Sequence, residues 1–99
     1  MKVVLTGAAY DDLLRIGQFI KRDSPARATT FVAELHARCR RVGTMPKAFP
    51  LVPGHEDEGI RRRPYRDYLI FYRVGPSAVE ILHILHGAQD YDAVLFPDD

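Results

Sequence analysis

The sequence is poor in cysteine and in long apolar runs. Its 99 residues include one cysteine, Cys39, so no disulfide can form within the chain, which fits a reducing compartment. The first apolar run, Val3–Leu5, is far too short for a signal peptide or a membrane-spanning helix. We therefore expect a cytoplasmic protein that does not associate with a membrane.

Sequence motifs of several enzyme classes are also missing. The chain has no Walker loop, no dinucleotide-binding fingerprint, no paired CxxC and no HExxH. The polar run from His55 to Glu58 has no second cluster with metal-ligand spacing, so we expect a solvated turn there. Cys39 falls in an apolar helical stripe, where a free cysteine behaves as a small hydrophobic residue. These absences predict no metal and no cofactor.

Net charge is nearly absent from the whole chain but not from its parts. The formal net charge is +1. Residues 1–37 carry 5 basic and 4 acidic groups, residues 38–66 carry 8 and 3, and residues 67–99 carry 1 and 6. A total near zero argues against non-specific nucleic-acid binding as the main role, so direct nucleic-acid binding is not expected. The basic middle and acidic tail indicate a charged partner, or simply a solvated surface with ion pairs.

The periodicity of the apolar residues predicts an α+β fold with the order β-α-α-β-β-β. The expected elements are a strand over 2–6, helices over 8–23 and 25–42, and strands over 59–65, 68–74 and 79–85. Two amphipathic helices joined this closely form an antiparallel hairpin, which should cover one face of a small, mainly antiparallel sheet. The last strand is apolar on both faces and should be interior, with the first strand on its free side. The length fits one domain over residues 1–99.

Glycine, proline and serine set the expected boundaries of the helices. Ser24 and Pro25 are suited to the N-cap and first position of the second helix, and Gly43 to its C-cap. Gly17 lies inside the apolar arc of the first helix. It costs roughly 1 kcal/mol relative to alanine, and a close approach by a second helix would explain it.

Two connecting regions are expected to pack on this core. Residues 44–58 contain three prolines and form a loop, which Phe49 and Leu51 should attach to the core. The tail over 88–96 should form one or two helical turns, with Tyr91, Val94 and Leu95 docking.

Basic, aromatic and histidine side chains are the candidates for function. Arg61 and Arg63 share a strand face with Tyr65, an arrangement that can clamp a phosphate backbone and stack a base, or simply protect an edge strand from aggregation. His86 ends the last strand near solvent and could act as a general acid or base. His83 should be hydrogen-bonded and partly buried, on the face of Val79, Ile81 and Leu85.

A second interpretation of these residues is catalytic. Arg61, Arg63, His86 and Tyr91 could support a metal-free RNA cleavage, in which a base activates the 2′-hydroxyl and an arginine stabilises the phosphorane. Their spacing does not show whether they converge.

The chain resembles the RelE/ParE superfamily of toxins from bacterial toxin–antitoxin pairs, and more closely its ParE branch. The matching motifs, in order, are Ala9-x-x-Asp12-Leu13-x-x-Ile16-x-x-Phe19-Ile20, Pro25-x-x-Ala28-x-x-Phe31, Pro46-x-x-Phe49-Pro50, Gly59-Ile60-Arg61-Arg62, Tyr68-x-Ile70-Phe71-Tyr72-Arg73-Val74 and Ile84-Leu85-His86-Gly87-Ala88. They cover nearly the full length, and their order and spacing are more specific than any single motif. One departure is Gln89, where the family usually has arginine.

The resemblance implies a function as well as a fold. ParE-like proteins act by blocking DNA gyrase without a cofactor. A ParD-like antitoxin neutralises them by wrapping the helical hairpin and part of the sheet. The alternatives are a RelE-like ribosome-dependent mRNA endonuclease, which would use the four residues named above, and an inert module that only forms a repressing complex. The candidates for target or antitoxin binding are Arg61, Arg63, Tyr65, Arg73, His86, Gln89, Asp90 and Tyr91.

Overall fold

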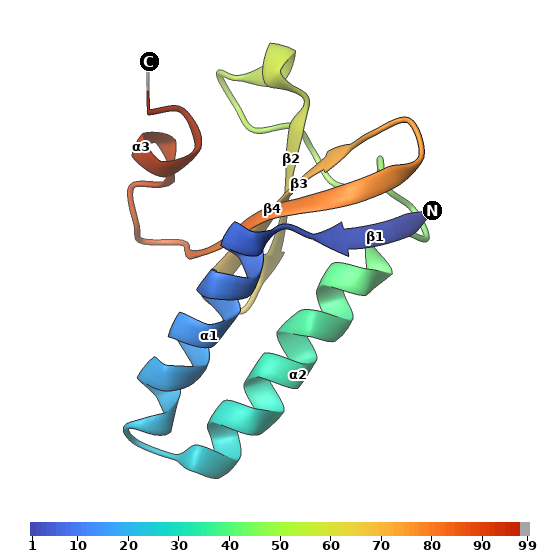
Figure 1. Cartoon of the computed structure of the whole chain (residues 1–99). Coiled ribbons are helices and arrows are strands. Elements are labelled where there is room, and N and C mark those ends of the chain that lie inside the picture. The colour runs from blue at the N-terminus through green and yellow to red at the C-terminus, as the bar shows by residue number, and fades with distance from the viewer. Residues whose placement is uncertain (98–99) are drawn as a thin grey trace.

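The computed structural model describes residues 1–97 and has the expected order of elements, including the short helix predicted in the tail; one short helix in the loop before the second strand was not predicted (Figure 1). The elements are β1 (Lys2–Leu5), α1 (Gly7–Lys21), α2 (Pro25–Arg41), the 3-10 helix η1 (Glu56–Glu58), β2 (Ile60–Tyr65), β3 (Tyr68–Val74), β4 (Ala78–His86) and α3 (Tyr91–Leu95). α1 and α2 lie side by side as an antiparallel hairpin (Figure 1).

The sheet is mixed, as expected, with one parallel pair. Its four strands have the order β1-β4-β3-β2. β1 runs parallel to β4, while β3 is antiparallel to both β4 and β2. The strand that is apolar on both faces, β4, is therefore interior, and β1 pairs on its free side as predicted.

A β-bulge in β4 corrects the expected strand faces. The partner of Phe71 is His83, but the partner of Tyr72 is Ile81, so Leu82 has no partner of its own. An extra residue in one strand reverses the alternation of the side chains that follow it. As a result Ile84, and not Leu85, joins Val79 and Ile81 on the hairpin side. The prediction that placed Leu85 on that face was wrong, because strict alternation does not extend through a bulge.

The hairpin has the predicted start of α2 and the predicted close approach at Gly17. The Ser24 hydroxyl accepts from Arg27 N at 3.2 Å, and Pro25 follows it as the first helical residue. A Cβ at Gly17 would lie 3.1 Å from Val32 Cγ2 on the other helix, closer than most Cβ contacts.

The predicted role of Gly43 was wrong. The C-cap of α2 is Val42, in a right-handed conformation, so no left-handed glycine ends the helix. Gly43 is needed for packing instead, because a Cβ there would overlap the carbonyl oxygen of Met1 and lie 2.7 Å from Val3 Cγ2.

Two hydrophobic clusters cover the two faces of the sheet. The larger cluster lies between the hairpin and the sheet and includes Leu35, Ile70 and Tyr72. The smaller cluster lies on the opposite face; its buried members are Val52, Ile60, Phe71, Leu85 and Phe96. The sheet is thus covered on one side by two long helices and on the other by loop and tail.

The loop between α2 and β2 follows the edge of β2. Leu51 forms a bridge with Arg61, and Val52 N donates to Ile60 O at 2.9 Å. Phe49 packs on the larger cluster, as predicted. Val52 is the residue that this loop buries, and no pattern in the sequence pointed to it.

Candidate functional site

An apolar groove lies on the hairpin, between α1 and α2. It has a volume of about 660 Å³ and is lined only by residues of α1 and α2, among them Tyr10, Leu14 and Val32. Tyr10 is 52% exposed and Leu14 is 64% exposed. Large apolar side chains that converge on one open groove are typical of a surface that another chain covers.

The groove exists because the outer stripe of α1 is apolar as well as the inner one. Tyr10, Leu14 and Gly17 recur at spacings of four and three, which places them along one side of the helix. The predicted apolar arc of this helix contained Ala9, Ile16 and Gly17, and its core residues pack on the sheet. The second stripe was visible in the sequence as Tyr10 and Leu14, two large apolar residues outside that arc.

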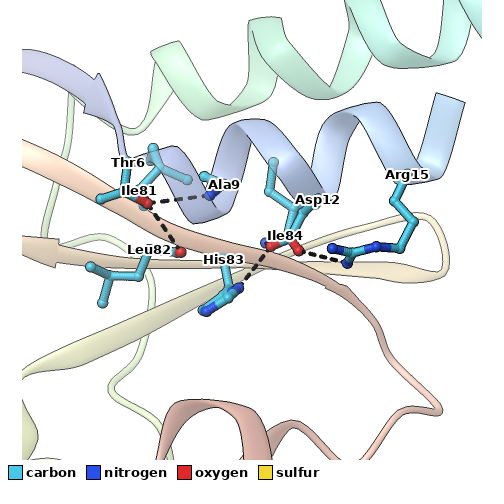
Figure 2. Close-up of polar contacts among 8 residues, drawn as sticks. All are labelled: Thr6, Ala9, Asp12, Arg15, Ile81, Leu82, His83 and Ile84. Carbon is cyan, nitrogen blue, oxygen red and sulfur yellow. Dashed lines mark hydrogen bonds and ion pairs between the residues drawn. The ribbon is translucent and has the colours of Figure 1, made fainter.

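A buried carboxylate joins α1 to β4 just beyond the end of β1 (Figure 2). Asp12 is 3% exposed, and its Oδ2 accepts from Ile84 N at 2.8 Å and lies 2.8 Å from His83 Nδ1. Its Oδ1 accepts from Arg15 Nη1 at 3.1 Å. Since the partner strand β1 has already ended, Asp12 supplies the acceptor that the free edge of β4 would otherwise lack.

Thr6 makes the neighbouring contact between helix and strand (Figure 2). Its hydroxyl donates to Ile81 O at 2.8 Å and accepts from Ala9 N at 3.3 Å, so it caps α1 while it holds β4. His83 is partly buried and hydrogen-bonded, as predicted, but its predicted face was wrong: its strand partner is Phe71, which belongs to the cluster opposite the hairpin, and not to that of Val79 and Ile81. Asp12 was named beforehand only as part of a family motif and without a partner, although it lies only about 40° from Ile16 around the helix and so points toward the sheet.

Arg61, Arg63 and Tyr65 share the hairpin side of β2, as the alternation predicted. Arg61 donates to the carbonyl of Phe49 at 2.7 Å and so secures the preceding loop. The Arg63 guanidinium lies 5.0 Å from the centre of the Phe49 ring. The Tyr65 hydroxyl donates to Glu34 Oε1 at 2.7 Å.

The residue between these two arginines faces the other way. Arg62 Nη1 donates to the Tyr91 hydroxyl at 2.7 Å, and the Tyr91 ring centre lies 5.0 Å from that of Phe71. Tyr91 therefore belongs to the face opposite the hairpin. Sequence analysis did not select Arg62, because its partner is 29 residues away and no local pattern links them.

The tail docks on this second face, but the set of residues that it buries differs from the predicted set. Tyr91 and Leu95 pack on the smaller cluster as predicted, but Val94 is exposed and Phe96 is buried in its place. The His55 ring stacks on Phe96 with centres 3.8 Å apart. The run from His55 to Glu58, expected to be wholly solvated, thus contributes one residue to the tail contact.

His86, Gln89 and Asp90 lie at the exposed end of β4. The His86 ring meets the edge of the Tyr68 ring at 5.3 Å, and its Nδ1 accepts from Ala88 N at 3.1 Å. His86 and Gln89 line a hollow of about 320 Å³ together with Phe19, which is 62% exposed.

Arg73 and Asp90 are the two remaining candidates. Arg73 is exposed on β3, opposite Ile60 on one side and Glu80 on the other. Asp90 is exposed and borders a small hollow beside α3.

The four residues proposed for RNA cleavage do not converge. Arg61 and Arg63 lie on the hairpin side of β2, and Tyr91 lies on the opposite face. His86 is at the end of β4 against Tyr68. A general acid or base must come within hydrogen-bond reach of the group it serves, and these side chains are dispersed over two faces of the sheet.

Burial controls the acid–base behaviour of the core groups. It raises the pKa of the Cys39 thiol to about 12, so this cysteine is a structural residue as predicted. It also raises the pKa of Tyr72, whose hydroxyl donates to Pro46 O at 2.7 Å. Burial lowers the pKa of Arg63, and the nearby charges of Arg38 and Arg41 lower it further.

Among residues 1–97, no group of three or more His, Cys, Asp or Glu side chains is placed to hold a metal ion. None of the helices in that part of the chain is long and apolar enough to cross a membrane.

Comparison with known proteins identifies the family. Residues 3–91 match the family model described as the ParE toxin of the type II toxin–antitoxin system parDE. No match was found among the curated proteins. A solved structure of the chromosomal ParDE TA system from P. aeruginosa contains a similar chain, with a TM-score of 0.74 and 19% sequence identity over 87% of this chain and 95% of that one. This chain therefore belongs to the ParE toxin family of type II toxin–antitoxin systems.

Proposed function

We propose that this toxin inhibits DNA gyrase by binding it, and that a ParD-like antitoxin neutralises the toxin by occupying the groove between α1 and α2. The observation that carries the antitoxin part is the groove itself. It is open and lined mainly by apolar side chains of two helices, which is the kind of surface that receives an amphipathic helical segment. Membership in the ParE toxin family supports such a partner.

Inhibition by binding also agrees with the dispersed polar residues. Arg61, Arg63, His86 and Tyr91 are occupied with loop, ring and tail contacts on different faces. A toxin that acts by contact needs an exposed surface and not an assembled acid–base pair. The exposed end of β4, with His86, Gln89 and Phe19, is our candidate for the gyrase contact.

Two reactions in parallel test the target. The purified chain is added to a gyrase supercoiling reaction and, separately, to translating ribosomes. We expect supercoiling to be lost while the mRNA stays intact. Codon-linked cuts in the mRNA with normal supercoiling would instead establish a ribosome-dependent endonuclease. Expression without an antitoxin is the control for activity, since healthy growth would mean that the chain is not an active toxin.

A further inference from the structure

Three arginines lie against the rings of Tyr65 and Phe49, and a fourth, Arg41, is near enough for its charge to act on one of them, Arg63. Arg38 and Arg41 lie in the last turn of α2, Arg63 lies in β2, and Arg66 lies in the turn between β2 and β3. We call these four residues the arginine patch. Within residues 1–97, none of them forms an ion pair; the nearby carboxylate of Glu34 accepts the Tyr65 hydroxyl.

Aromatic rings hold three of the four guanidinium groups. The Arg38 and Arg66 groups lie 4.9 and 5.7 Å from the centre of the Tyr65 ring, and the Arg63 group lies 5.0 Å from that of Phe49. Contact with a ring restricts a long, flexible side chain. Arg63 is restricted further, because its Nη1 donates to Pro64 O at 2.8 Å. The patch is therefore organised before any ligand arrives.

Three of the charges in the patch, those of Arg38, Arg41 and Arg63, repel one another, whereas the pKa of Arg66 is raised by its hydrogen bond to Tyr65 and by the nearby charges of Tyr65 and Glu34. After burial, the charges of Arg38 and Arg41 are the main causes that lower the pKa of Arg63. A bound anion would relieve this repulsion and satisfy the free N–H donors at the same time.

The contacts between guanidinium groups and rings favour one class of anionic partner over others. An acidic peptide would need apolar anchors at the centre of its interface, and a single-stranded nucleic acid would need rings on which to stack its bases. Here guanidinium groups already lie against the two rings. A duplex backbone needs neither, because its phosphates are contacted by charge and hydrogen bonds alone.

We propose that the arginine patch binds the phosphate backbone of duplex DNA without reading its sequence. The net charge of +1 led us to expect no direct nucleic-acid binding, but that total averages the basic patch with the acidic tail. Helical geometry places Arg38 and Arg41 roughly 160° and 140° around α2 from His36, which lines the groove. DNA and a segment in the groove would then bind on different sides of the hairpin. This proposal is independent of the gyrase proposal.

Fluorescence anisotropy with a labelled 30-base-pair duplex of arbitrary sequence tests the patch. About four phosphate contacts predict that raising salt from 50 to 200 mM weakens binding by on the order of 100-fold. The double variant Arg38→Gln/Arg63→Gln should bind at least about tenfold more weakly at 50 mM salt, with a salt slope reduced by about two. Arg40→Gln is the matched control, because Arg40 is exposed in the same helical turn but is directed about 160° from Arg38.

The same anisotropy measurements, made with a further variant and with other anionic ligands, check the folding of the variants and the preference for duplex DNA. Arg66→Gln removes an exposed member of the patch and should weaken binding severalfold even if the double variant does not fold. Equal losses in Arg40→Gln and the patch variants would overturn the proposal. So would tighter binding to a single-stranded RNA or a poly-glutamate peptide than to the duplex, or no binding to the duplex at 50 mM salt.

Discussion

At the scale of single residues, Asp12 shows how one buried charge can be stabilised by its position. It accepts hydrogen bonds from a backbone N–H of β4 and from an arginine, and it contacts a histidine ring. A carboxylate that satisfies three groups at once offsets its cost of burial, but its removal leaves those groups without an acceptor.

We therefore predict that Asp12→Ala destabilises the fold by about 2–4 kcal/mol. The N–H of Ile84 would lose its acceptor, and a buried donor without a partner is costly. Arg15→Ala is the matched control in the same network. Its side chain is 70% exposed, so the ion pair contributes roughly 0.5 kcal/mol or less. Urea unfolding monitored by circular dichroism measures both. Equal effects of the two substitutions would contradict the assigned role of Asp12.

Roles that depend on local pattern were predictable for individual residues, and roles that depend on distant partners were not. Ser24 as a cap and the shared face of Arg61 and Arg63 follow from spacing within a few residues. The bond between Arg62 and Tyr91 joins residues 29 positions apart, so it requires the tail to be placed first. The candidate set was incomplete for this reason: it contained Tyr91 but not the arginine that contacts it.

At the scale of elements, the hairpin has two apolar sides, one buried and one open. The inner side packs on the sheet, and the outer side forms the groove that contains Leu14 and Tyr10. The helices themselves were predictable because their period of 3.6 residues is strong. The bulge at Leu82 was not, because it depends on how β4 meets β3 and α1 and not on its own residues.

Leu14→Glu should weaken the complex with the antitoxin by at least about tenfold. Leu14 is 64% exposed in the free chain, so the substitution should leave the fold intact while it places a charge in an apolar interface. Ala37→Glu is the matched control, since it adds the same charge at an exposed position of α2 outside the groove. Titration calorimetry with the purified antitoxin measures the effect. Unchanged affinity in Leu14→Glu would exclude the groove as the antitoxin site.

At the scale of the whole molecule, the two faces of the sheet are covered very differently. The hairpin contributes two helices of 15 and 17 residues to one face. The tail contributes a helix of 5 residues to the other, which is held by the Tyr91 hydroxyl and by the ring of Phe96. The sequence predicted that the hairpin covers one face of the sheet and that the tail docks on the core. It could not assign the tail to a face of the sheet, since that depends on the bulge and on the turn after β4.

This asymmetry predicts that the tail opens without the rest of the protein. Opening it would expose Phe96 and Tyr91 but would leave the larger cluster between hairpin and sheet intact. Regions with few buried contacts exchange their amide hydrogens through such partial openings, while core strands exchange only through global unfolding. Hydrogen exchange measured by mass spectrometry should therefore show at least tenfold faster exchange for the amides of α3 than for those of β3. Arg62→Gln removes the bond to Tyr91 and should accelerate exchange in α3 while leaving that in β3 nearly unchanged. Equal acceleration in both elements would mean that tail and core form one cooperative unit.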